Sequence, residues 1–300
     1  MSHATPGPLE VFIPFWGDPD LLYATVESVK AQTDPAWVVT VVDDCYPDPD
    51  VATHFAREVD PRIRYERNAT NLGIEANFQR CLDLASGELM MFMGCDDLLE
   101  PGFVARTHAL VQMHPEADII QPGVRVIDDD GTPATTLADL VKARLRPRVS
   151  APVVLTGEPL AASLLRGNWL YWPSLVFRTE RVQRFAFRRD LPIILDLALV
   201  IDMLADGAAL LLDPEVTFAY RRHATSLSGT ALADGSRFTQ DRRYFADAAE
   251  QMHRVGWPRA ARAAGWRWTS RLHGLAALPH AARSQRRAGL AQALRHAFGR

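Results

Sequence analysis

The sequence contains few cysteines and no long apolar run. Three of its 300 residues are cysteine, and Cys45, Cys81 and Cys95 lack the spacing of a metal site. Such a small, odd number disfavours a disulfide framework and is typical of a reducing cytoplasm. No stretch approaches the ~18 consecutive apolar residues of a membrane-spanning helix. Residues 1–8 do not have the basic and apolar segments of a signal peptide, so we expect none.

Two common nucleotide-binding signatures are also absent. The chain has neither the Gly-x-Gly-x-x-Gly fingerprint of dinucleotide-binding domains nor a Walker phosphate loop. It is therefore not an evident dehydrogenase or P-loop enzyme. Its length and its 48% of hydrophobic residues predict one large domain, or one domain with an appendage.

Acidic and basic residues are distributed unevenly. Residues 237–300 hold 13 arginines against three acidic residues, a net charge of +10, although the whole chain carries −3. The basic region also contains Trp257 and Trp266, and arginine with tryptophan suits peripheral contact at the inner face of a membrane. The alternative is packing of this region on the acidic remainder. No nucleic-acid-binding module is evident, so we expect no nucleic-acid partner.

Hydrophobic periodicity predicts alternating strands and helices over the first 120 residues. This alternation indicates a parallel α/β sheet. The predicted strands cover residues 9–14, 38–42, 63–65, 88–93 and 119–120, and the helices cover 18–31, 51–59, 75–85 and 100–114.

The second half is less regular. Residues 132–152 are interpreted as a flexible, substrate-facing loop, and the Arg- and Ala-rich end as helical, with a break at 256–258. We predict a catalytic domain over residues 1–232 and a helical C-terminal region over 233–300. Further strands are predicted at 124–127, 171–177, 208–212 and 216–220, and further helices at 160–166 and 197–206.

Two acidic pairs each follow a predicted strand. Asp43 and Asp44 end one apolar run, and Asp96 and Asp97 end another. Ligands of open parallel sheets bind outside the carboxyl ends of the strands, so both pairs are expected at one crevice. Carboxylates there suit a hydroxyl-rich ligand, a hard divalent cation, or both.

An ordered set of short segments resembles glycosyltransferase family 2. The resemblance covers roughly residues 9–230 and implies a GT-A fold, in which helices flank a Rossmann-like, mostly parallel sheet. It also implies transfer of a sugar, with inversion, from a UDP, dTDP or GDP donor to an acceptor hydroxyl, in polysaccharide, glycolipid or glycoconjugate biosynthesis. The segments are 11–14 (Val-Phe-Ile-Pro), 41–44 (Val-Val-Asp-Asp), 71–77 (Asn-Leu-Gly-Ile-Glu-Ala-Asn), 85–88 (Ala-Ser-Gly-Glu), 96–102 (Asp-Asp-Leu-Leu-Glu-Pro-Gly) and 220–223 (Tyr-Arg-Arg-His).

The resemblance implies a nucleotide site built from several strand ends. A carboxylate at a strand end can accept hydrogen bonds from a uracil N–H or from ribose hydroxyls. Alternatively, the first acidic pair only caps the following segment. The implied nucleotide-binding residues are Pro14, Phe15, Asp43, Asp44, Asn77 and Asp96.

The second acidic pair resembles the short metal-binding motif of the family. By this resemblance Asp97 holds Mn²⁺ or Mg²⁺, which would offset charge on the departing diphosphate. Gly94 and Cys95 stand where the commoner motif has a further acidic residue. His223 is a second candidate ligand, and Arg222 is a candidate contact of the diphosphate.

Asp196 is our candidate for the general base, because the family places a carboxylate there, facing the acceptor hydroxyl. Such a base typically contributes ~10²–10⁴-fold to the rate. Alternatively Asp196 is a helix N-cap, and Asp190 and Asp202 compete for the catalytic role. Trp172 is predicted to stack on the acceptor, and core packing is the alternative.

Two other classes of function remain open. One is a catalytically silent nucleotide-sugar binding module of the same fold, since the metal motif is reduced. The other is a sugar-nucleotide pyrophosphorylase. A pyrophosphorylase is expected to carry a Gly-rich loop with Lys or Arg after the first strand, where this chain has Phe-Trp-Gly-Asp at residues 15–18.

Overall fold

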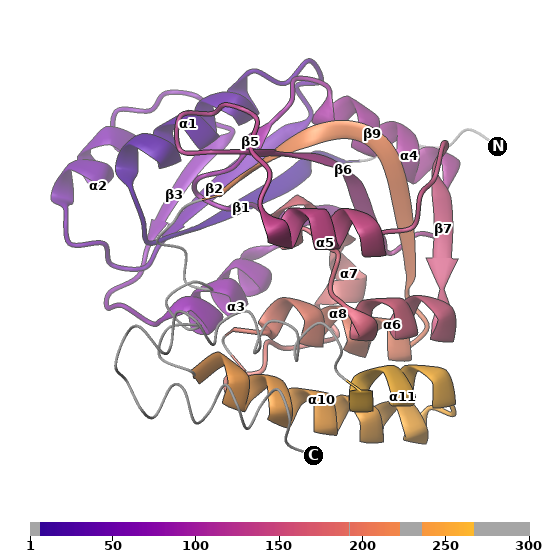
Figure 1. Cartoon of the computed structure of the whole chain (residues 1–300). Helices are drawn as coiled ribbons and strands as arrows, with labels where there is room; N and C mark the ends of the chain where they lie inside the picture. The colour runs from indigo at the N-terminus through magenta and orange to yellow at the C-terminus, as the bar shows by residue number, and fades with distance from the viewer. Residues whose placement is uncertain (1–6, 192, 223–235, 267–300) are drawn as a thin grey trace.

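A computed structural model describes residues 7–191, 193–222 and 236–266 (Figure 1). Within these residues the chain forms one nine-stranded sheet in the order β3-β2-β1-β4-β8-β6-β9-β5, with β7 paired to β9. The candidate ligand His223 lies outside the described residues. The strands are β1 (Leu9–Phe15), β2 (Trp37–Asp43), β3 (Ile63–Arg67), β4 (Leu89–Phe92), β5 (Leu98–Leu99), β6 (Ile119–Ile127), β7 (Val153–Thr156), β8 (Val176–Arg178) and β9 (Ala209–Arg221).

Helices flank this sheet, which confirms the predicted α/β class. The first helix starts after Asp18 as predicted, but the second starts after Asp48 and covers Pro49–Phe55 rather than 51–59. Asp18 and Asp48 each accept a hydrogen bond from the backbone N–H two residues on, and a proline follows each. None of the described helices is long and apolar enough to cross a membrane. The helices are α1 (Pro19–Lys30), α2 (Pro49–Phe55), α3 (Ile74–Leu84), α4 (Phe103–Met113), α5 (Leu137–Leu145), α6 (Gly157–Arg166), α7 (Thr179–Val182), α8 (Leu195–Ala205), α10 (Ser236–Arg254) and α11 (Pro258–Trp266).

The N-terminal half of the sheet is parallel and the other half is mixed. β1 pairs in parallel with β2 and β4, and β2 pairs in parallel with β3. β8 then runs antiparallel to both β4 and β6, whereas β6 and β9 are parallel. The carboxyl ends of β1, β2 and β4 therefore lie at the same edge, as the sequence predicts.

Two pairs of predicted strands are continuous in the structure. Residues 119–120 and 124–127 belong to β6, and residues 208–212 and 216–220 belong to the long, curved β9 (Figure 1). The register between β6 and β9 shifts at Gly123. A Cβ atom there would lie only 2.6 Å from the carbonyl oxygen of Glu215, so this close approach of two backbones requires glycine.

The prediction of an irregular loop over residues 132–152 is wrong in part. Thr136 and Asp139 form a reciprocal capping box that starts α5, and β7 begins at Val153. The predicted strand 171–177 is also shorter than expected. Residues Trp172–Ser174, which contain a proline, form a 3₁₀ turn before β8.

Apolar side chains form a core on each face of the sheet. One core contains side chains of α1, α2 and α4, and the other contains those of α3, α6 and α8. The second core also includes Tyr244, Met252 and Ala260 of α10 and α11, which lie beneath α6 and α8 in Figure 1. The described part of the basic C-terminal region therefore packs on the sheet domain. The division at residue 232 stays a prediction.

The contact between α8 and α10 generates a stability prediction. Gln251 Nε2 donates a hydrogen bond to Asp202 Oδ1 at 2.7 Å, and burial raises the pKa of Asp202 above its ordinary value of 3.8. Because the pKa of Asp202 is higher in the folded state than in the unfolded state, the ionised carboxylate lowers the free energy of unfolding. The penalty is absent below the unfolded pKa and grows as pH rises through the folded pKa.

We therefore expect Asp202→Asn to melt a few degrees higher than the parent at pH 7, because the neutral amide oxygen still accepts from Gln251. The advantage should vanish below about pH 4. Thermal unfolding across this pH range measures both effects. An unchanged or lower melting temperature at pH 7 would show that burial of the charge is not costly.

Candidate active site at the carboxyl ends of the strands

Backbone contacts bring three strand ends together. The Asp44 N–H donates to the Phe15 carbonyl at 3.0 Å, and the Met93 N–H donates to the Phe12 carbonyl at 2.8 Å. The segments that follow β1, β2 and β4 therefore start side by side. The two acidic pairs lie at one edge of the sheet, where the sequence places them.

Asp43 is fully buried and fixes the end of β2. Its Oδ1 accepts from the Tyr46 N–H at 2.6 Å, and its Oδ2 accepts from Arg67 Nη1 at 3.1 Å and from the Tyr65 hydroxyl. Burial and this carboxylate raise the pKa of Tyr65. These contacts match the alternative in which Asp43 only caps the segment that follows β2. Its role in nucleotide binding stays a prediction.

Asp44 holds the segment before α3. Its Oδ1 accepts from Asn68 Nδ2 at 2.9 Å and from the Leu72 N–H at 2.8 Å, and its Oδ2 accepts from the Gly73 N–H at 2.9 Å. The same Asn68 amide donates to Asn77 Oδ1, also at 2.9 Å. Asp44 and Asn77 thus share one buried network, and their predicted contact with a nucleoside is untested.

The aromatic surface at this edge differs from the expected one. Phe15 is fully buried against Tyr46, with ring centroids 5.0 Å apart. Trp16 is 52% exposed, and its ring meets Tyr46 edge-on at 5.5 Å. Trp16, which the sequence analysis did not select, therefore presents the accessible ring beside the carboxylates. Its position directly after β1 was the available signal. Pro14 is partly buried.

Asp97 has an unusual environment. Its Oδ1 accepts from the Arg221 N–H at 2.8 Å, but its buried Oδ2 has no hydrogen-bond partner among the described residues. Burial and the nearby charge of Asp96 raise the pKa of Asp97. A buried carboxylate oxygen without a protein donor fits a divalent cation.

The described residues contain no group of three or more His, Cys, Asp or Glu side chains that could hold a metal ion. An ion at Asp97 would thus take most of its oxygen ligands from phosphate and water, which is how Mg²⁺ is commonly bound. A single protein carboxylate with the remaining ligands from phosphate and water fits the predicted Mn²⁺ or Mg²⁺.

Gly94 makes the conformation of the acidic loop possible, the segment 93–97 between β4 and β5. A Cβ atom there would overlap Asp97 Oδ2 and lie 2.8 Å from Asp96 Oδ1. Both carboxylates therefore fold back over this residue. The glycine at this place in the motif is the residue that leaves room for them.

Arg221 fastens the acidic loop to β9. It is 7% exposed, and its Nε donates to the Asp96 carbonyl at 2.8 Å. Its Nη1 donates to the carbonyls of Asp128 and Asp129 at 2.9 and 2.8 Å. The sequence analysis selected the next residues, Arg222 and His223, and missed this one, although all three belong to the same short motif.

Arg222 points toward α5. Its guanidinium pairs with Asp139, with Nη2 2.6 Å from Oδ1, and lies 5.0 Å from the centre of the Tyr220 ring. The hydrogen bond raises the pKa of Arg222 against the opposing effect of burial. Its charge is thus matched within the protein, and the predicted diphosphate contact stays a prediction.

Asp196 lies in the first turn of α8 and is partly buried. The N-cap residue of this helix is Ile194, so the N-cap alternative for Asp196 is wrong. Asn168 Nδ2 donates to Asp196 Oδ2 at 3.2 Å. The competitors face other partners, since Asp202 accepts from Gln251 and Asp190 pairs with two arginines, Arg188 and Arg243.

Trp172 belongs to an aromatic cluster. Its ring stacks on Phe92 at 5.4 Å with an interplanar angle of 15°, and it also contacts Phe78, Phe177 and Phe187. This is the core-packing alternative. The buried Trp172 Nε1 has no hydrogen-bond partner among the described residues. An acceptor contact of Trp172 is therefore untested.

The fold and the carboxylates at its strand ends define an α/β protein of the GT-A type. Residues 10–162 match the family model described as glycosyl transferase family 2. The chain belongs to this family.

Curated relatives carry related descriptions. The chain is 26% identical over 141 residues to the putative glycosyltransferase EpsE of Bacillus subtilis, covering 46% of this chain and 48% of EpsE. It is 30% identical over 113 residues to a PGL/p-HBAD biosynthesis glycosyltransferase of Mycobacterium bovis, covering 37% and 44%. An uncharacterized Sinorhizobium fredii protein is 32% identical over 131 residues, 42% of this chain and 14% of that protein. The chain thus spans half or less of these three relatives.

Solved structures share the fold. S. aureus TarS 1–349 in complex with UDP-GlcNAc matches with a TM-score of 0.62 and 14% identity, over 80% of this chain and 66% of that one. The complex of TarS 1–349 with UDP matches with a TM-score of 0.59, over 80% and 65%. At this identity the likeness shows the fold alone.

The position of Gly94 generates a prediction. Gly94→Ala should displace the carboxylates of Asp96 and Asp97 while the strands stay paired, so the Mn²⁺-dependent rise in melting temperature with UDP should fall by more than half. Gly102→Ala is the matched control, because a Cβ atom there meets nothing within 4 Å. Equal shifts in both variants would show that the acidic loop does not bind the metal and nucleotide.

Proposed function

We propose that this protein is an inverting, metal-dependent glycosyltransferase of the hexosyltransferase type. It transfers a sugar from a nucleoside diphosphate donor to an acceptor hydroxyl. The observation that carries this proposal is the buried, unpartnered Asp97 Oδ2 at the edge where the strand ends meet, in a chain of glycosyltransferase family 2. UDP is the first donor to test, because the TarS structures hold UDP-GlcNAc and UDP.

The donor site is proposed from the strand ends. Asp97 would hold Mn²⁺ or Mg²⁺, which supplies positive charge to the departing diphosphate. Asp96 and the exposed Trp16 would contact the nucleoside, since an aromatic face can stack on a base. Arg221 positions the loop through its hydrogen bond to the Asp96 carbonyl and its N–H on Asp97.

The acceptor side is assigned to Asp196. Inversion in one displacement needs a base opposite the leaving diphosphate, and this base removes the acceptor proton as the new bond forms. Asn168 holds one oxygen of Asp196 through a hydrogen bond of 3.2 Å, which orients the carboxylate. The two competing carboxylates face α10 instead, since Asp202 accepts from Gln251 and Asp190 pairs with Arg243.

The setting of the reaction is proposed from the relatives and the cysteines. One relative is described as a biosynthesis glycosyltransferase, and we propose that this chain likewise acts in biosynthesis, of a polysaccharide, glycolipid or glycoconjugate. All three cysteines are free, which suits a reducing cytoplasm. The basic C-terminal region would bring the enzyme to the inner face of the membrane.

Thermal shift with UDP, dTDP and GDP, each with and without Mn²⁺, tests the donor site. We expect one nucleotide to raise the melting temperature in a metal-dependent way, since a ligand of the native state stabilises it. Hydrolysis of the matching sugar nucleotide then separates an enzyme from a silent binding module. No shift with any nucleotide would contradict the proposal.

Asp196→Asn tests the base. This variant should keep the nucleotide-dependent thermal shift but lose ~10²–10⁴-fold in transfer rate, measured as donor cleavage with water or sugar acceptors. Asp202→Asn, six residues further along α8, is the matched control and should keep its rate. If Asp196→Asn cleaves the donor as fast as the parent, Asp196 is not the base.

A further inference from the structure

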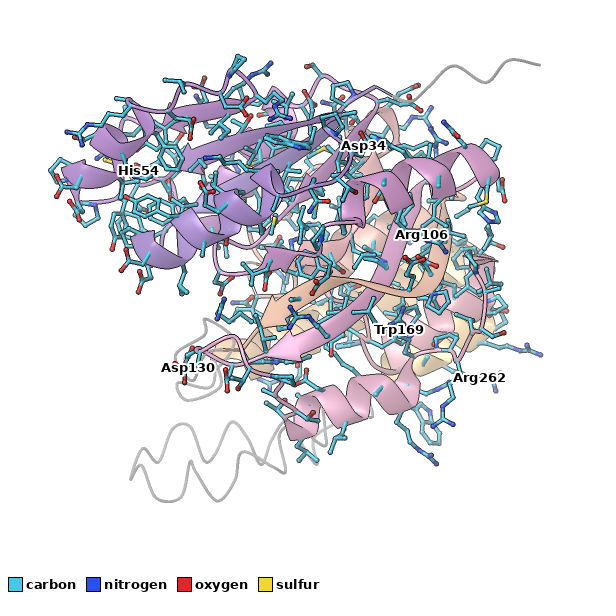
Figure 2. All side chains as sticks on the ribbon, turned by 90° about the horizontal axis from the view of Figure 1, so that it is seen from above. Asp34, His54, Arg106, Asp130, Trp169 and Arg262 are labelled. Carbon is cyan, nitrogen blue, oxygen red and sulfur yellow. The ribbon has the colours of Figure 1, made fainter. Side chains whose placement is uncertain are left out.

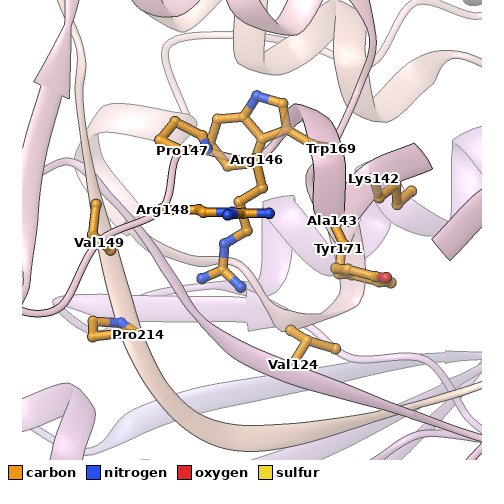
Figure 3. A pocket seen from close by; sticks show the side chains of 10 residues that line it. All are labelled: Val124, Lys142, Ala143, Arg146, Pro147, Arg148, Val149, Trp169, Tyr171 and Pro214. Carbon is orange, nitrogen blue, oxygen red and sulfur yellow. The ribbon is translucent and has the colours of Figure 1, made fainter. Parts of the chain in front are cut away.

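A basic cavity lies between α5 and the strands β6 and β9. Its volume is about 340 Å³, and its lining includes Lys142, Arg146 and Arg148, together with Trp169 and Tyr171 (Figure 3). It contains none of the carboxylates of the candidate active site, and none of its lining residues is acidic. Trp169, which lines the cavity, lies across the molecule from His54 of α2 (Figure 2).

Arg146 brings a partly buried charge to this cavity. Its Nη2 donates to the carbonyls of Pro122 and Asp213 at 3.2 and 2.9 Å, and burial lowers its pKa. The Asp213 carboxylate is unavailable to it, because both oxygens accept from Arg106 at 3.0 and 2.8 Å. Arg146 therefore donates to backbone carbonyls and forms no ion pair among the described residues, and the nearby charge of Asp213 offsets the effect of burial only in part.

Arg148 and Lys142 add to this charge. Arg148 is exposed and forms no ion pair within the described part of the chain. Lys142 donates to the Leu170 carbonyl, and its Nζ lies 4.3 Å from the centre of the Tyr171 ring. Three cationic side chains thus line a cavity that has no acidic lining residue. This charge favours binding of an anion with more than one negative charge.

The uncharged lining residues of the cavity indicate which chemical group is attached to the anion. Trp169 is fully buried, so the accessible aromatic surface is that of Tyr171, and Val124 and Val149 contribute apolar surface. We propose that this cavity binds a phosphomonoester that bears an aromatic or apolar group. The phosphate contacts Arg146 and Arg148, and the attached group packs against Tyr171, Val124 and Val149.

The cavity is separate from the acidic edge but connected to it. The Tyr171 hydroxyl donates to Asp139 Oδ1 at 3.2 Å, and the same oxygen accepts from Arg222. Arg222 follows Arg221, whose N–H contacts Asp97. The proposal itself does not rest on glycosyl transfer, since it depends only on the charges and walls of the cavity.

Calorimetric binding of phenyl phosphate in EDTA tests the site, because EDTA removes metal-dependent binding at Asp97. We expect Arg148→Gln to weaken binding about tenfold, since it removes a charged donor without disturbing a protein contact. Arg144→Gln is the matched control. It removes an equal charge from the last turn of α5, four residues before Arg148, but residue 144 does not line the cavity, so affinity should change less than about twofold.

A second experiment distinguishes a lipid headgroup from a soluble phosphomonoester as the ligand. Both variants are sedimented with vesicles of phosphatidic acid in phosphatidylcholine. Binding that Arg148→Gln alone weakens supports the cavity. A loss confined to vesicles identifies a lipid headgroup, and a loss confined to phenyl phosphate identifies a soluble phosphomonoester. If neither probe binds, or if both variants lose affinity equally, the proposal is overturned.

Discussion

The hydrogen bonds of Arg221 are the constraint on which the candidate site depends. This one residue, at the end of β9, holds the backbone of Asp96, one oxygen of Asp97 and two carbonyls after β6. Its guanidinium is buried, so leaving these donors unsatisfied would be costly. The loop between β4 and β5 thereby takes a fixed position against the mixed half of the sheet. The second Asp97 oxygen is left facing inward without a donor among the described residues.

The two acidic pairs share a position in the fold but differ in environment. Asp43 and Asp44 use their oxygens on partners from the protein, which stabilise the segments after β2 and β3. Arg221 holds the second pair through the backbone carbonyl of Asp96 and one carboxylate oxygen of Asp97, while both carboxylates fold over Gly94. The second pair is therefore the one that keeps a carboxylate oxygen without a hydrogen-bond partner among the described residues. A carboxylate whose lone pairs are already used has less to offer an ion.

The described C-terminal helices are part of the fold around the site. α10 and α11 complete the core that contains α6 and α8, and α10 supplies the partner of Asp202. This arrangement directs Asp202 away from a catalytic role and leaves Asp196, in the first turn of the same helix, with Asn168 as its partner. The basic composition of the region therefore does not require an external partner for its described part.

The sequence by itself determined the α/β class, the parallel pairing in the N-terminal half and the meeting of the acidic pairs. These follow from local apolar runs, from helix caps such as Asp18 and from the common edge of parallel strands. Only the tertiary structure decided the roles of Arg221, Trp16 and Gly94, because each depends on neighbours distant in the chain. The capping box of α5 could be read from Thr136 and Asp139, but the cavity beside that helix could not. A cavity is defined by segments that folding brings together, here α5, β6, β9 and the residues before β8.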